Sequence, residues 1–388
     1  MLAIHTLRDY SGGVMKIIYF ITEDWYFWTH RRPIARAYMD AGNDVIVVTR
    51  VNKHQDRIES EGFRVLPIQL KRKGKNIFKE LRSLLEIVQI YRRERPDIVH
   101  HVAVKPVIYG SIAAMVTRVP FTVNALAGLG YIFVNQGLKA SFIKRIFLLI
   151  YKIIFYSKST IGLFQNPEDQ DLFISSGIVN KKRTELIKGS GVDMSLFKIT
   201  PEHSDVITVL LAGRMLWDKG VGDLVDAAKI LHSKGVKCRI VLVGKPDIEN
   251  PKSIPECILQ RWNDEGIVEW WGYQENMAGI FSSSHIVSLP TTYGEGVPKF
   301  LIEAAACGRP IVATDVPGCR EIVHDGQNGL LVPPHDAKSL ADALEKLIKD
   351  TDLRKIMGAR GRALAEEEFS EEIVVSKTMR LYSKLIGN

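Results

Sequence analysis

The sequence predicts an α/β protein of two successive domains, each a doubly wound parallel sheet with helices on both faces. Three observations predict this fold class. The chain has 388 residues, which is more than one core usually holds. Short apolar, β-branched segments alternate with segments of helical period, and this alternation starts again past the middle of the chain. Because such sheets bind ligands beyond the carboxyl ends of their strands, we expect two facing sheets to share one cleft.

The first domain is expected to cover residues 15–187. Residues 1–14 are interpreted as a disordered leader, since Met15 opens a strand-like segment, KIIYFIT. The other expected strands of this half are 44–49, 63–68, 96–103 and 121–126, and the expected helices are 31–41 and 77–94.

The second domain is expected over residues 188–369. Its strands are predicted at 206–214, 238–244, 267–272, 285–290, 309–314 and 330–334, with a helix at 221–234. This order places the loops after Gly213, Gly244, Gly272 and Pro290 around a common site. Residues 370–388 are expected to form a last helix that could pack on either domain.

Charge is divided unevenly between the two halves. Residues 1–187 hold 28 Lys and Arg against 16 Asp and Glu, a net +12, and the remainder holds 24 against 28, a net −4. The basic half predicts an anionic partner. No nucleic-acid module is recognised, so a membrane surface or a phosphorylated acceptor is favoured. Without an apolar run of membrane-spanning length or a secretory signal, we expect a cytoplasmic chain.

The segment 294–303, GEGVPKFLIE, is the strongest chemical signal. Glu295 lies in a glycine-rich turn, and Glu303 follows about two helical turns later. The amides of Gly296 and Val297 at a helix start suit an anionic or hydroxyl-rich ligand. A carboxylate is a good acceptor for a ribose diol or for sugar hydroxyls. The alternative is two solvated glutamates around a helix cap.

A second segment, 213–220, directly follows a predicted strand. Arg214 and Lys219 are five residues apart there and could hold a diphosphate from two sides. Their task would be to stabilise the negative charge that builds up on a leaving nucleotide diphosphate. The alternative is an ordinary surface loop. The two segments together would supply acceptors for sugar and ribose and donors for phosphate.

The runs 214–220 and 295–334 resemble the C-terminal lobe of the family 4 (group 1) retaining glycosyltransferases. The Glu295–Glu303 spacing, followed by ACGRPIVAT at 306–314, is specific to that family. The resemblance implies the GT-B fold, in which two Rossmann-like domains enclose the active site and a C-terminal helix returns to the N-terminal lobe. It implies that Glu303 holds the donor ribose, that Glu295 contacts the transferred sugar, and that no metal or other cofactor is needed. The implied donor-binding residues are Gly213, Arg214, Lys219, Gly244, Gly272, Tyr273, Glu295, Gly296, Val297, Pro298, Lys299 and Glu303.

Three segments of the N-terminal half extend the resemblance to one subgroup of the family. Segments 27–31, 100–110 and 128–133 are similar to a bacterial subgroup that extends polyprenyl-diphosphate-linked glycans. The acceptor-binding residues that we expect are His30, Arg31, His100, Lys105 and Gly128. His101 is a candidate catalytic residue beside Arg214, Lys219 and Glu295, although a lone histidine is more often structural. The family often has two glycines after its first strand, where this chain has Glu23-Asp24-Trp25-Tyr26.

The resulting hypothesis is a retaining glycosyltransferase. It would move a sugar from a nucleotide-sugar, UDP-linked by preference, to a lipid-diphosphate-linked saccharide at the inner face of the cell membrane. A non-hydrolysing nucleotide-sugar epimerase of the same fold is the alternative, and a non-enzymatic scaffold is a second one. Residues 142–158 predict either a buried helix with surface cations or a helix that lies on anionic lipid. The run Lys71-Arg72-Lys73-Gly74-Lys75 is a second basic segment.

Overall fold

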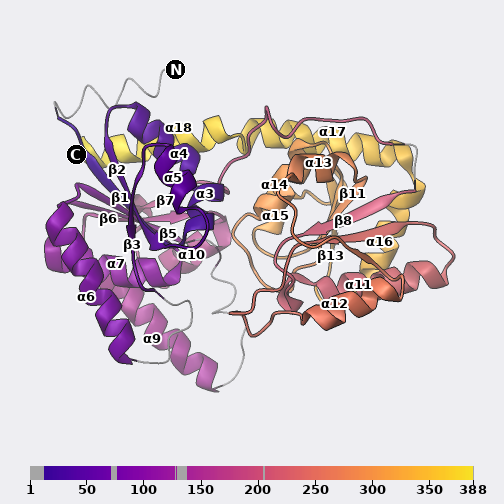
Figure 1. The fold of residues 1–388 in the computed structure, drawn as a ribbon, viewed down its shortest axis with the longest axis horizontal. Helices are drawn as coiled ribbons and strands as arrows, with labels where there is room; N and C mark the ends of the chain where they lie inside the picture. Colours follow the sequence, from indigo (N-terminus) through magenta and orange to yellow (C-terminus); the bar gives the residue numbers. More distant parts are fainter. Residues whose placement is uncertain (1–12, 71–76, 127, 129–137, 204–205, 388) are drawn as a thin grey trace. The chain divides into compact units, whose positions relative to one another are not determined.

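A computed structural model describes residues 13–70, 77–126, 128, 138–203 and 206–387. It divides into two compact units (Figure 1). Unit 1 comprises the chain up to Ser190 together with residues from Glu372 onward, and unit 2 runs from Gly191 to Glu371. The sequence placed the divisions after residues 187 and 369. Residues 1–12 of the expected leader and the basic run 71–75 lie outside the described residues.

The sheet of unit 1 is parallel throughout, with strand order β3-β2-β1-β4-β5-β6-β7. Its strands are β1 (Lys16–Glu23), β2 (Asp44–Arg50), β3 (Arg64–Pro67), β4 (Ile98–Val102), β5 (Phe121–Leu126), β6 (Thr160–Phe164) and β7 (Thr184–Leu186). Strand β1 is central, and Ile18 faces Ile46 of β2 on one side and Val99 of β4 on the other.

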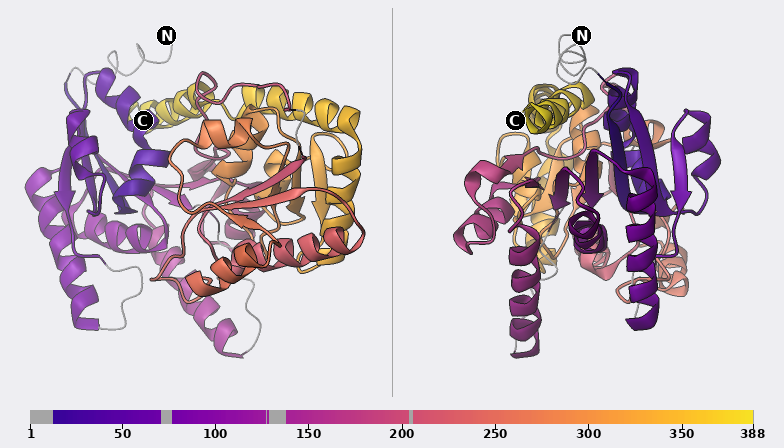
Figure 2. Two further views of the ribbon diagram at one scale, coloured as in Figure 1. Left: turned by 45° about the vertical axis from the view of Figure 1, so that its right-hand side comes forward. Right: turned by 90° about the vertical axis from the view of Figure 1, so that its left-hand side faces the viewer.

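Helices cover both faces of this sheet (Figures 1 and 2). They are α3 (Asp24–His30), α4 (Arg32–Asp40), α5 (Gln55–Ser60), α6 (Ile77–Glu94), α7 (Val104–Thr117), α9 (Leu138–Ile154), α10 (Pro167–Ser175), the short η1 (Lys181–Arg183) and α18 (Glu371–Ile386). Successive residues of β1 enter different cores, as the period of two in a strand requires. Tyr19 packs with Tyr382 of α18, whereas Phe20 packs with Tyr91 of α6.

The segment after β1 differs from the expectation. The expected helix began at residue 31, but α3 already begins at Asp24, and Arg31 is the junction between α3 and α4. The buried Asp24 carboxylate accepts hydrogen bonds from the amides of Trp25 (2.7 Å), Asn52 (2.6 Å) and His54 (2.9 Å). It thereby fixes the helix start to the segment that follows β2.

The sheet of unit 2 is also parallel, in the order β10-β9-β8-β11-β12-β13. Its strands are β8 (Thr208–Ala212), β9 (Arg239–Val243), β10 (Glu269–Trp270), β11 (Ile286–Leu289), β12 (Ile311–Thr314) and β13 (Gly329–Val332). Its helices are η2 (Trp217–Lys219), α11 (Val221–Ser233), α12 (Glu256–Asp264), α13 (Met277–Ser282), α14 (Lys299–Ala306), α15 (Cys319–Ile322), α16 (Ala337–Lys349) and α17 (Thr351–Glu368). The predicted α/β class with two parallel sheets is confirmed.

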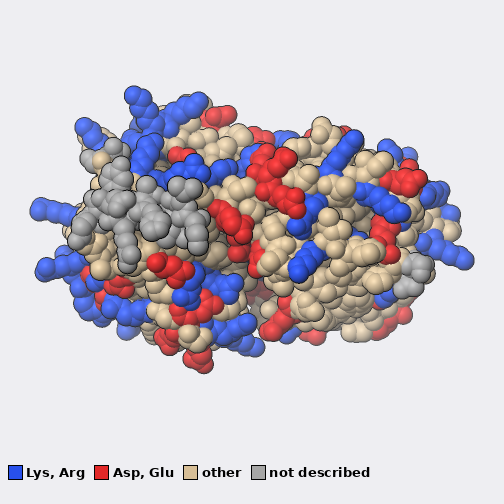
Figure 3. Space-filling model, turned by 90° about the horizontal axis from the view of Figure 1, so that it is seen from above, with Lys and Arg blue, Asp and Glu red and all other residues tan. Residues whose placement is uncertain are grey.

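The charge difference between the halves is visible on the surface. On the face drawn in Figure 3, Lys and Arg side chains gather along the rim of unit 1, whereas acids and bases are interspersed over unit 2. Within the described part of the chain, no helix combines the length and the apolar character that crossing a bilayer requires.

Candidate active site

The loops at the carboxyl ends of β8, β9 and β10 are tied together by backbone hydrogen bonds. The amide of Gly213 donates to Val243 (2.9 Å), and the amide of Gly244 donates to Gly272 (2.7 Å). A Cβ on Gly244 would lie 1.8 Å from the carbonyl oxygen of Gly213, so only glycine allows these loops to approach so closely. The three glycines that the sequence predicted at this edge are therefore brought together.

Lys219 and Glu295 form an ion pair although 76 residues separate them. The Thr291 hydroxyl also donates to Oε1 of Glu295, at 3.1 Å. The side chain of Lys219 is 17% exposed and that of Glu295 is 14% exposed, so the pair is largely screened from water. The two segments with the strongest chemical signals thus meet at one point.

Backbone contacts fix this meeting point. The carbonyl oxygen of Asp218, beside Lys219, accepts hydrogen bonds from the amide of Thr292 (2.9 Å) and the hydroxyl of Thr291 (3.1 Å). Gly220 has φ +72°, and a Cβ there would lie 1.8 Å from the carbonyl oxygen of Pro290. The segment that carries Lys219 therefore lies directly against the loop after β11.

The charges around Lys219 keep it protonated. Burial acts to lower the pKa of Lys219, but Glu295 and Tyr293 raise it more, and the net pKa lies above its usual value. The Lys219 Nζ atom lies 5.9 Å from the centre of the Tyr293 ring. A cation with a fixed position and few waters around it is suited to bind a phosphate oxygen.

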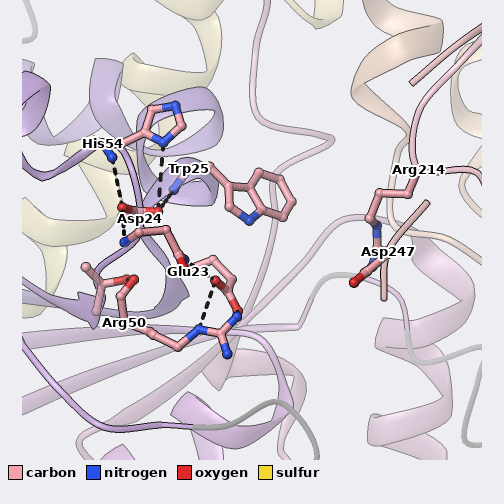
Figure 4. A network of polar contacts seen from close by, with 9 residues as sticks. Glu23, Asp24, Trp25, Arg50, His54, Arg214 and Asp247 are labelled. Atoms are coloured by element: carbon pink, nitrogen blue, oxygen red, sulfur yellow. Dashed lines mark hydrogen bonds and ion pairs between the residues drawn. The ribbon is translucent and has the colours of Figure 1, made fainter. Parts of the chain in front are cut away.

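Arg214 is the second cation of the site. Its guanidinium forms an ion pair of 2.8 Å with Asp247, in the loop after β9 (Figure 4). The positive charge of Arg214 acts to lower the pKa of Lys219, so the two cations are close enough to interact electrostatically. The Arg214 side chain is 41% exposed and therefore accessible to a ligand.

Glu303 lies on α14, the helix that begins directly after Pro298. Burial raises the pKa of Glu303 to about 7, Lys299 acts to lower it, and Glu371 adds to the rise. None of the hydrogen bonds found among the described residues involves the Glu303 carboxyl group, which leaves it available to a ligand. At neutral pH this group is therefore poised between its protonated and ionised forms.

The turn into α14 is closely packed. Val297 is buried in the core of unit 2, and no side chain among the described residues caps the helix start at Pro298. Gly318 has φ +84°, and a Cβ there would lie 1.7 Å from the carbonyl oxygen of Gly296.

Tyr273, which follows β10, is 56% exposed, and the Lys245 ammonium lies 5.5 Å from its ring centre.

In unit 1, the two histidines of β4 differ from the expectation. We expected His100 to bind the acceptor and His101 to be a catalytic candidate, but neither residue has any exposed surface. His101 contacts Tyr91 Oη through Nε2 (2.9 Å) and Asn124 Oδ1 through Nδ1 (2.8 Å), and burial lowers its pKa to about 4. A Cβ on Gly110 would lie 2.4 Å from the same ring. His101 is therefore built as a core residue, and we assign it no contact with a substrate.

His100 belongs to a different buried cluster, on the other face of β4. Its Nδ1 lies 2.6 Å from the hydroxyl of Tyr382, which is 3.0 Å from the hydroxyl of Tyr19. Burial, with Arg31 and His101 nearby, lowers the pKa of His100 well below its usual value, so this histidine is neutral. Arg31 is 2% exposed, and its Nε has no hydrogen-bond partner among the described residues.

The remaining predicted acceptor residues are spread along unit 1. The His30 ring is stacked on Tyr26 at 4.0 Å between ring centres, with its Nδ1 2.6 Å from the Thr29 hydroxyl. Lys105, in the first turn of α7, donates to both carboxylate oxygens of Glu80 on α6, at 2.9 and 3.0 Å. Gly128 has φ +77° and is flanked by residues that the structure does not describe.

The end of β1 and the start of α3 hold two buried acids, Glu23 and Asp24. Glu23 is paired with Arg50 at 2.8 Å and accepts a hydrogen bond from the Asn52 side chain at 2.8 Å (Figure 4). Asp24 binds the backbone as described above. These carboxylates are satisfied by unit 1 itself and stabilise the ends of β1 and β2.

Comparison with known proteins decides the family. The model of the "Glycosyl transferases group 1" family matches residues 206–350, and the model "Glycosyl transferase 4-like" matches residues 16–166. The chain belongs to the group 1 glycosyltransferases. The two matches together span most of both units, so each sheet corresponds to one domain of the family.

Two relatives of this glycosyltransferase extend over most of its length. One is the N,N'-diacetylbacillosaminyl-diphospho-undecaprenol alpha-1,3-N-acetylgalactosaminyltransferase of Campylobacter jejuni, 26% identical over 92% of this chain and 96% of the relative. The other is the UDP-Gal:alpha-D-GlcNAc-diphosphoundecaprenol alpha-1,3-galactosyltransferase of Escherichia coli, 25% identical over 81% of this chain and 82% of the relative. The chain is therefore similar to enzymes of bacterial glycan assembly along almost all of its length.

A solved structure shows the same fold. HepE from Anabaena, in complex with UDP and glucose, is 20% identical, covers 95% of this chain and 99% of its own, and gives a TM-score of 0.78. This likeness shows the GT-B fold of the glycosyltransferase.

Some contacts of the site were not predicted from the sequence. Asp247 pairs with Arg214 from 33 residues away, and no spacing or motif pointed to it. Gly220 and Gly318 were inside the segments that carried the resemblance. A glycine in a loop is itself a sequence signal for the left-handed backbone that the structure shows at both positions. In the part of the chain that the structure describes, no three His, Cys, Asp or Glu side chains gather as metal ligands would.

Proposed function

We propose that this glycosyltransferase transfers a sugar from a nucleotide-sugar, UDP-linked by preference, to a saccharide carried on a polyprenyl diphosphate. The observation that carries the proposal is the Lys219–Glu295 pair, with Arg214 and Glu303 on neighbouring elements of unit 2. Cations suited to a diphosphate and acids suited to hydroxyl groups occupy the carboxyl edge of one parallel sheet. That edge is where such sheets bind nucleotides.

The donor would bind through these four side chains. Lys219 and Arg214 would hold the diphosphate, with Lys219 as a point charge and Arg214 as a planar fork. Each cation is now paired with a carboxylate, Glu295 or Asp247, which keeps it in position until the donor binds. Glu295 would then accept hydrogen bonds from the transferred sugar, and Glu303 from the ribose hydroxyls.

The transfer would proceed with retention of the anomeric configuration. The acceptor hydroxyl oxygen forms the new bond to the anomeric carbon on the face from which the nucleotide diphosphate leaves. The bond between that carbon and the phosphate oxygen breaks, and the leaving oxygen takes the acceptor proton. Lys219 and Arg214 would stabilise the charge on the leaving diphosphate, the task that a metal ion performs in other transferases, so we propose a reaction without a metal.

The proposed acceptor follows from the relatives and from unit 1. The names of the Campylobacter and Escherichia relatives describe substrates on diphospho-undecaprenol. Unit 1 is the basic half of the chain. Lys105 and Gly128 follow shortly after the carboxyl ends of β4 and β5, whereas His30 and the buried Arg31 follow β1 through helix α3. A lipid-linked acceptor places the enzyme at the inner surface of the cell membrane.

The test is a transfer assay with several UDP- and GDP-sugars, each with and without a polyprenyl-diphosphate monosaccharide. We expect sugar to enter the lipid fraction only when both substrates are present, also in EDTA, and the product linkage to keep the donor configuration by NMR. A Lys229→Ala variant, which alters an exposed lysine paired with Asp226, serves as the matched control for Lys219→Ala. Conversion of a nucleotide-sugar without acceptor would instead identify the epimerase alternative, and no conversion in any arm would contradict the proposal.

A further inference from the structure

Helix α9 carries apolar side chains on two opposite faces. Its inner face packs into a core cluster through Phe147, Tyr151 and Ile154. Its outer face exposes Ile146 (43%), Leu149 (59%) and Ile153 (55%). These three follow the i, i+3, i+7 spacing of one helical stripe, so they form a continuous outward-facing apolar strip.

Helix α6 repeats this arrangement. Its inner face contributes Ile87 and Tyr91 to the core, while Phe78 (85%), Leu81 (52%) and Leu85 (53%) are exposed. The spacing is again i, i+3, i+7. An amphipathic helix that packs on a domain normally turns a polar face outward. Two helices of the same unit that instead expose apolar strips mark an interaction surface.

The fully exposed charges beside both strips are positive, whereas the acids Glu80 and Glu86 of α6 are half-buried, and Glu80 is paired with Lys105. Lys79 and Arg82 are exposed on α6, and Arg145 and Lys152 on α9. Helix α9 contains no acidic residue. The exposed Tyr156 (88%) and Lys158 follow it directly. Apolar strips bordered by cations fit a surface that is apolar inside and anionic at its boundary, which is the composition of an anionic lipid bilayer.

The position of the helices favours the same partner. Both α6 and α9 begin at the carboxyl edge of the unit 1 sheet and reach past it in the same direction (Figures 1 and 2). Helix α6 has 18 residues, about 27 Å, and follows β3, which has four residues, about 13 Å. The overhanging part of α6 therefore lies at the edge where the acceptor would bind.

We propose that the outer faces of α6 and α9 form a lipid-docking surface that inserts into the headgroup boundary of an anionic bilayer. The role of this surface rests on the proposed function, because docking there would bring the diphosphate headgroup of a lipid-linked acceptor to the carboxyl edge of unit 1. The binding of the surface to lipid does not require sugar transfer. The two strips, rather than the general positive charge of the unit, specify the docking side.

Vesicle sedimentation with the full chain tests the surface. The probes are vesicles of phosphatidylcholine alone and vesicles with about one-third phosphatidylglycerol. One variant combines Phe78→Ser, Leu81→Ser and Leu85→Ser, and the other combines Ile146→Ser, Leu149→Ser and Ile153→Ser. The matched control is Met115→Ser with Val116→Ser, which alters two exposed apolar residues (40% and 54%) at the other end of unit 1, where α7 finishes.

We expect the unchanged chain to bind anionic vesicles more tightly than neutral ones. Each triple variant should lose about tenfold or more in vesicle affinity, since three apolar contacts with lipid are removed, and the control should bind as the unchanged chain does. Triple variants that bind equally well would overturn the proposal, as would an unchanged chain that binds no vesicle. A dimer in light scattering that the triple variants convert to monomers would assign the strips to a second copy instead.

Transfer assays separate this inference from the proposed function. The triple variants should keep transfer to a soluble acceptor with a shortened lipid and lose transfer to a long-chain acceptor embedded in vesicles. Loss of vesicle binding in a chain that transfers no sugar at all would leave the docking surface supported and the proposed function refuted. Equal activity of the triple variants and the unchanged chain on the embedded acceptor would overturn the role of the surface.

Discussion

Lys219 is the residue on which the proposed chemistry depends most. It is largely buried, positively charged and paired with Glu295, so its ammonium group is held in place before a donor binds. A pre-positioned cation costs no reorganisation when charge develops on the leaving group. This is why a single lysine can contribute much to the rate although it takes part in no bond making.

We predict that Lys219→Ala lowers kcat by about two to three orders of magnitude, the loss expected for one charge-stabilising donor. Arg214→Ala should have a loss of the same order, because it removes the second cation of the diphosphate. Steady-state kinetics on the donor that the transfer assay selects provides the measurement. A Lys219→Ala enzyme within a few-fold of the unchanged one would refute the assignment, and Lys229→Ala should leave kcat unchanged.

From the raised pKa of Glu303 we predict that donor binding depends on pH. Burial raises its pKa to about 7, so the carboxyl group is mostly protonated at pH 6 and mostly ionised at pH 8. Ribose hydroxyls donate more strongly to a carboxylate than to a protonated carboxyl group. The Kd for a UDP-sugar should therefore fall by up to about tenfold between these pH values, following the ionised fraction.

The measurement is isothermal titration of a UDP-sugar, whose diphosphate does not titrate in this range. Glu303→Gln cannot ionise, and its donor Kd should be weaker and independent of pH between 6 and 8. A pH dependence that persists in Glu303→Gln would show that another group causes it and would remove Glu303 from the ribose site.

At the scale of elements, the segment η2 and the loop after β11 act as one structural piece. Hydrogen bonds from Thr291 and Thr292 to Asp218 join them, and Gly220 lies against Pro290 with no room for a side chain. This contact sets the position of Lys219 relative to Glu295. The geometry of the site is therefore determined by backbone packing as much as by the charged side chains.

We predict that Gly220→Ala lowers kcat/KM by about tenfold or more and destabilises unit 2, because its Cβ would displace the Pro290 carbonyl and separate the two loops. Gly235→Ala is a matched control, since Gly235 has the same φ of +72° and nothing within 4 Å of its Cβ. That control carries only the left-handed backbone cost of about 1 kcal/mol and should keep normal kinetics. Equal effects of both substitutions would show that backbone conformation, not the loop contact, is responsible.

At the scale of the whole molecule, the last helix stabilises the first half of the chain. Helix α18 places Val374, Met379, Leu381, Tyr382 and Leu385 in the core of unit 1, next to strand β1. The hydroxyl of Tyr382 reaches His100 Nδ1 and Tyr19, 282 and 363 residues away in sequence. Strand β1 and helix α18 therefore belong to one core, although they are far apart in the sequence, and the core of unit 1 is incomplete without α18.

We predict that Tyr382→Phe lowers the free energy of unfolding by about 1–3 kcal/mol, because it leaves His100 Nδ1 buried without a partner. Urea unfolding followed by far-UV circular dichroism measures the change. Tyr156→Phe removes a hydroxyl from a side chain that is 88% exposed and should leave the unfolding free energy as it is. A Tyr382→Phe protein as stable as the control would contradict the structural role of this cluster.

The sequence by itself determined the two parallel sheets, since β-branched apolar segments and helical periods are local properties of the chain. It also singled out the residues that we propose for donor binding, because Arg214, Lys219, Glu295 and Glu303 stand in segments that resemble the glycosyltransferase family. The sequence also predicted that the loops after the strands of unit 2 lie close together, because parallel strands bring their carboxyl ends to one edge of the sheet.

The tertiary structure alone decided the partners and the burial of these residues. Asp247 as the partner of Arg214, the raised pKa of Glu303 and the enclosed ring of His101 depend on atoms contributed by other elements. The exposed strips of α6 and α9 were decided in the same way. A periodic sequence shows that a helix has apolar faces, and only packing shows which of those faces the rest of the chain covers.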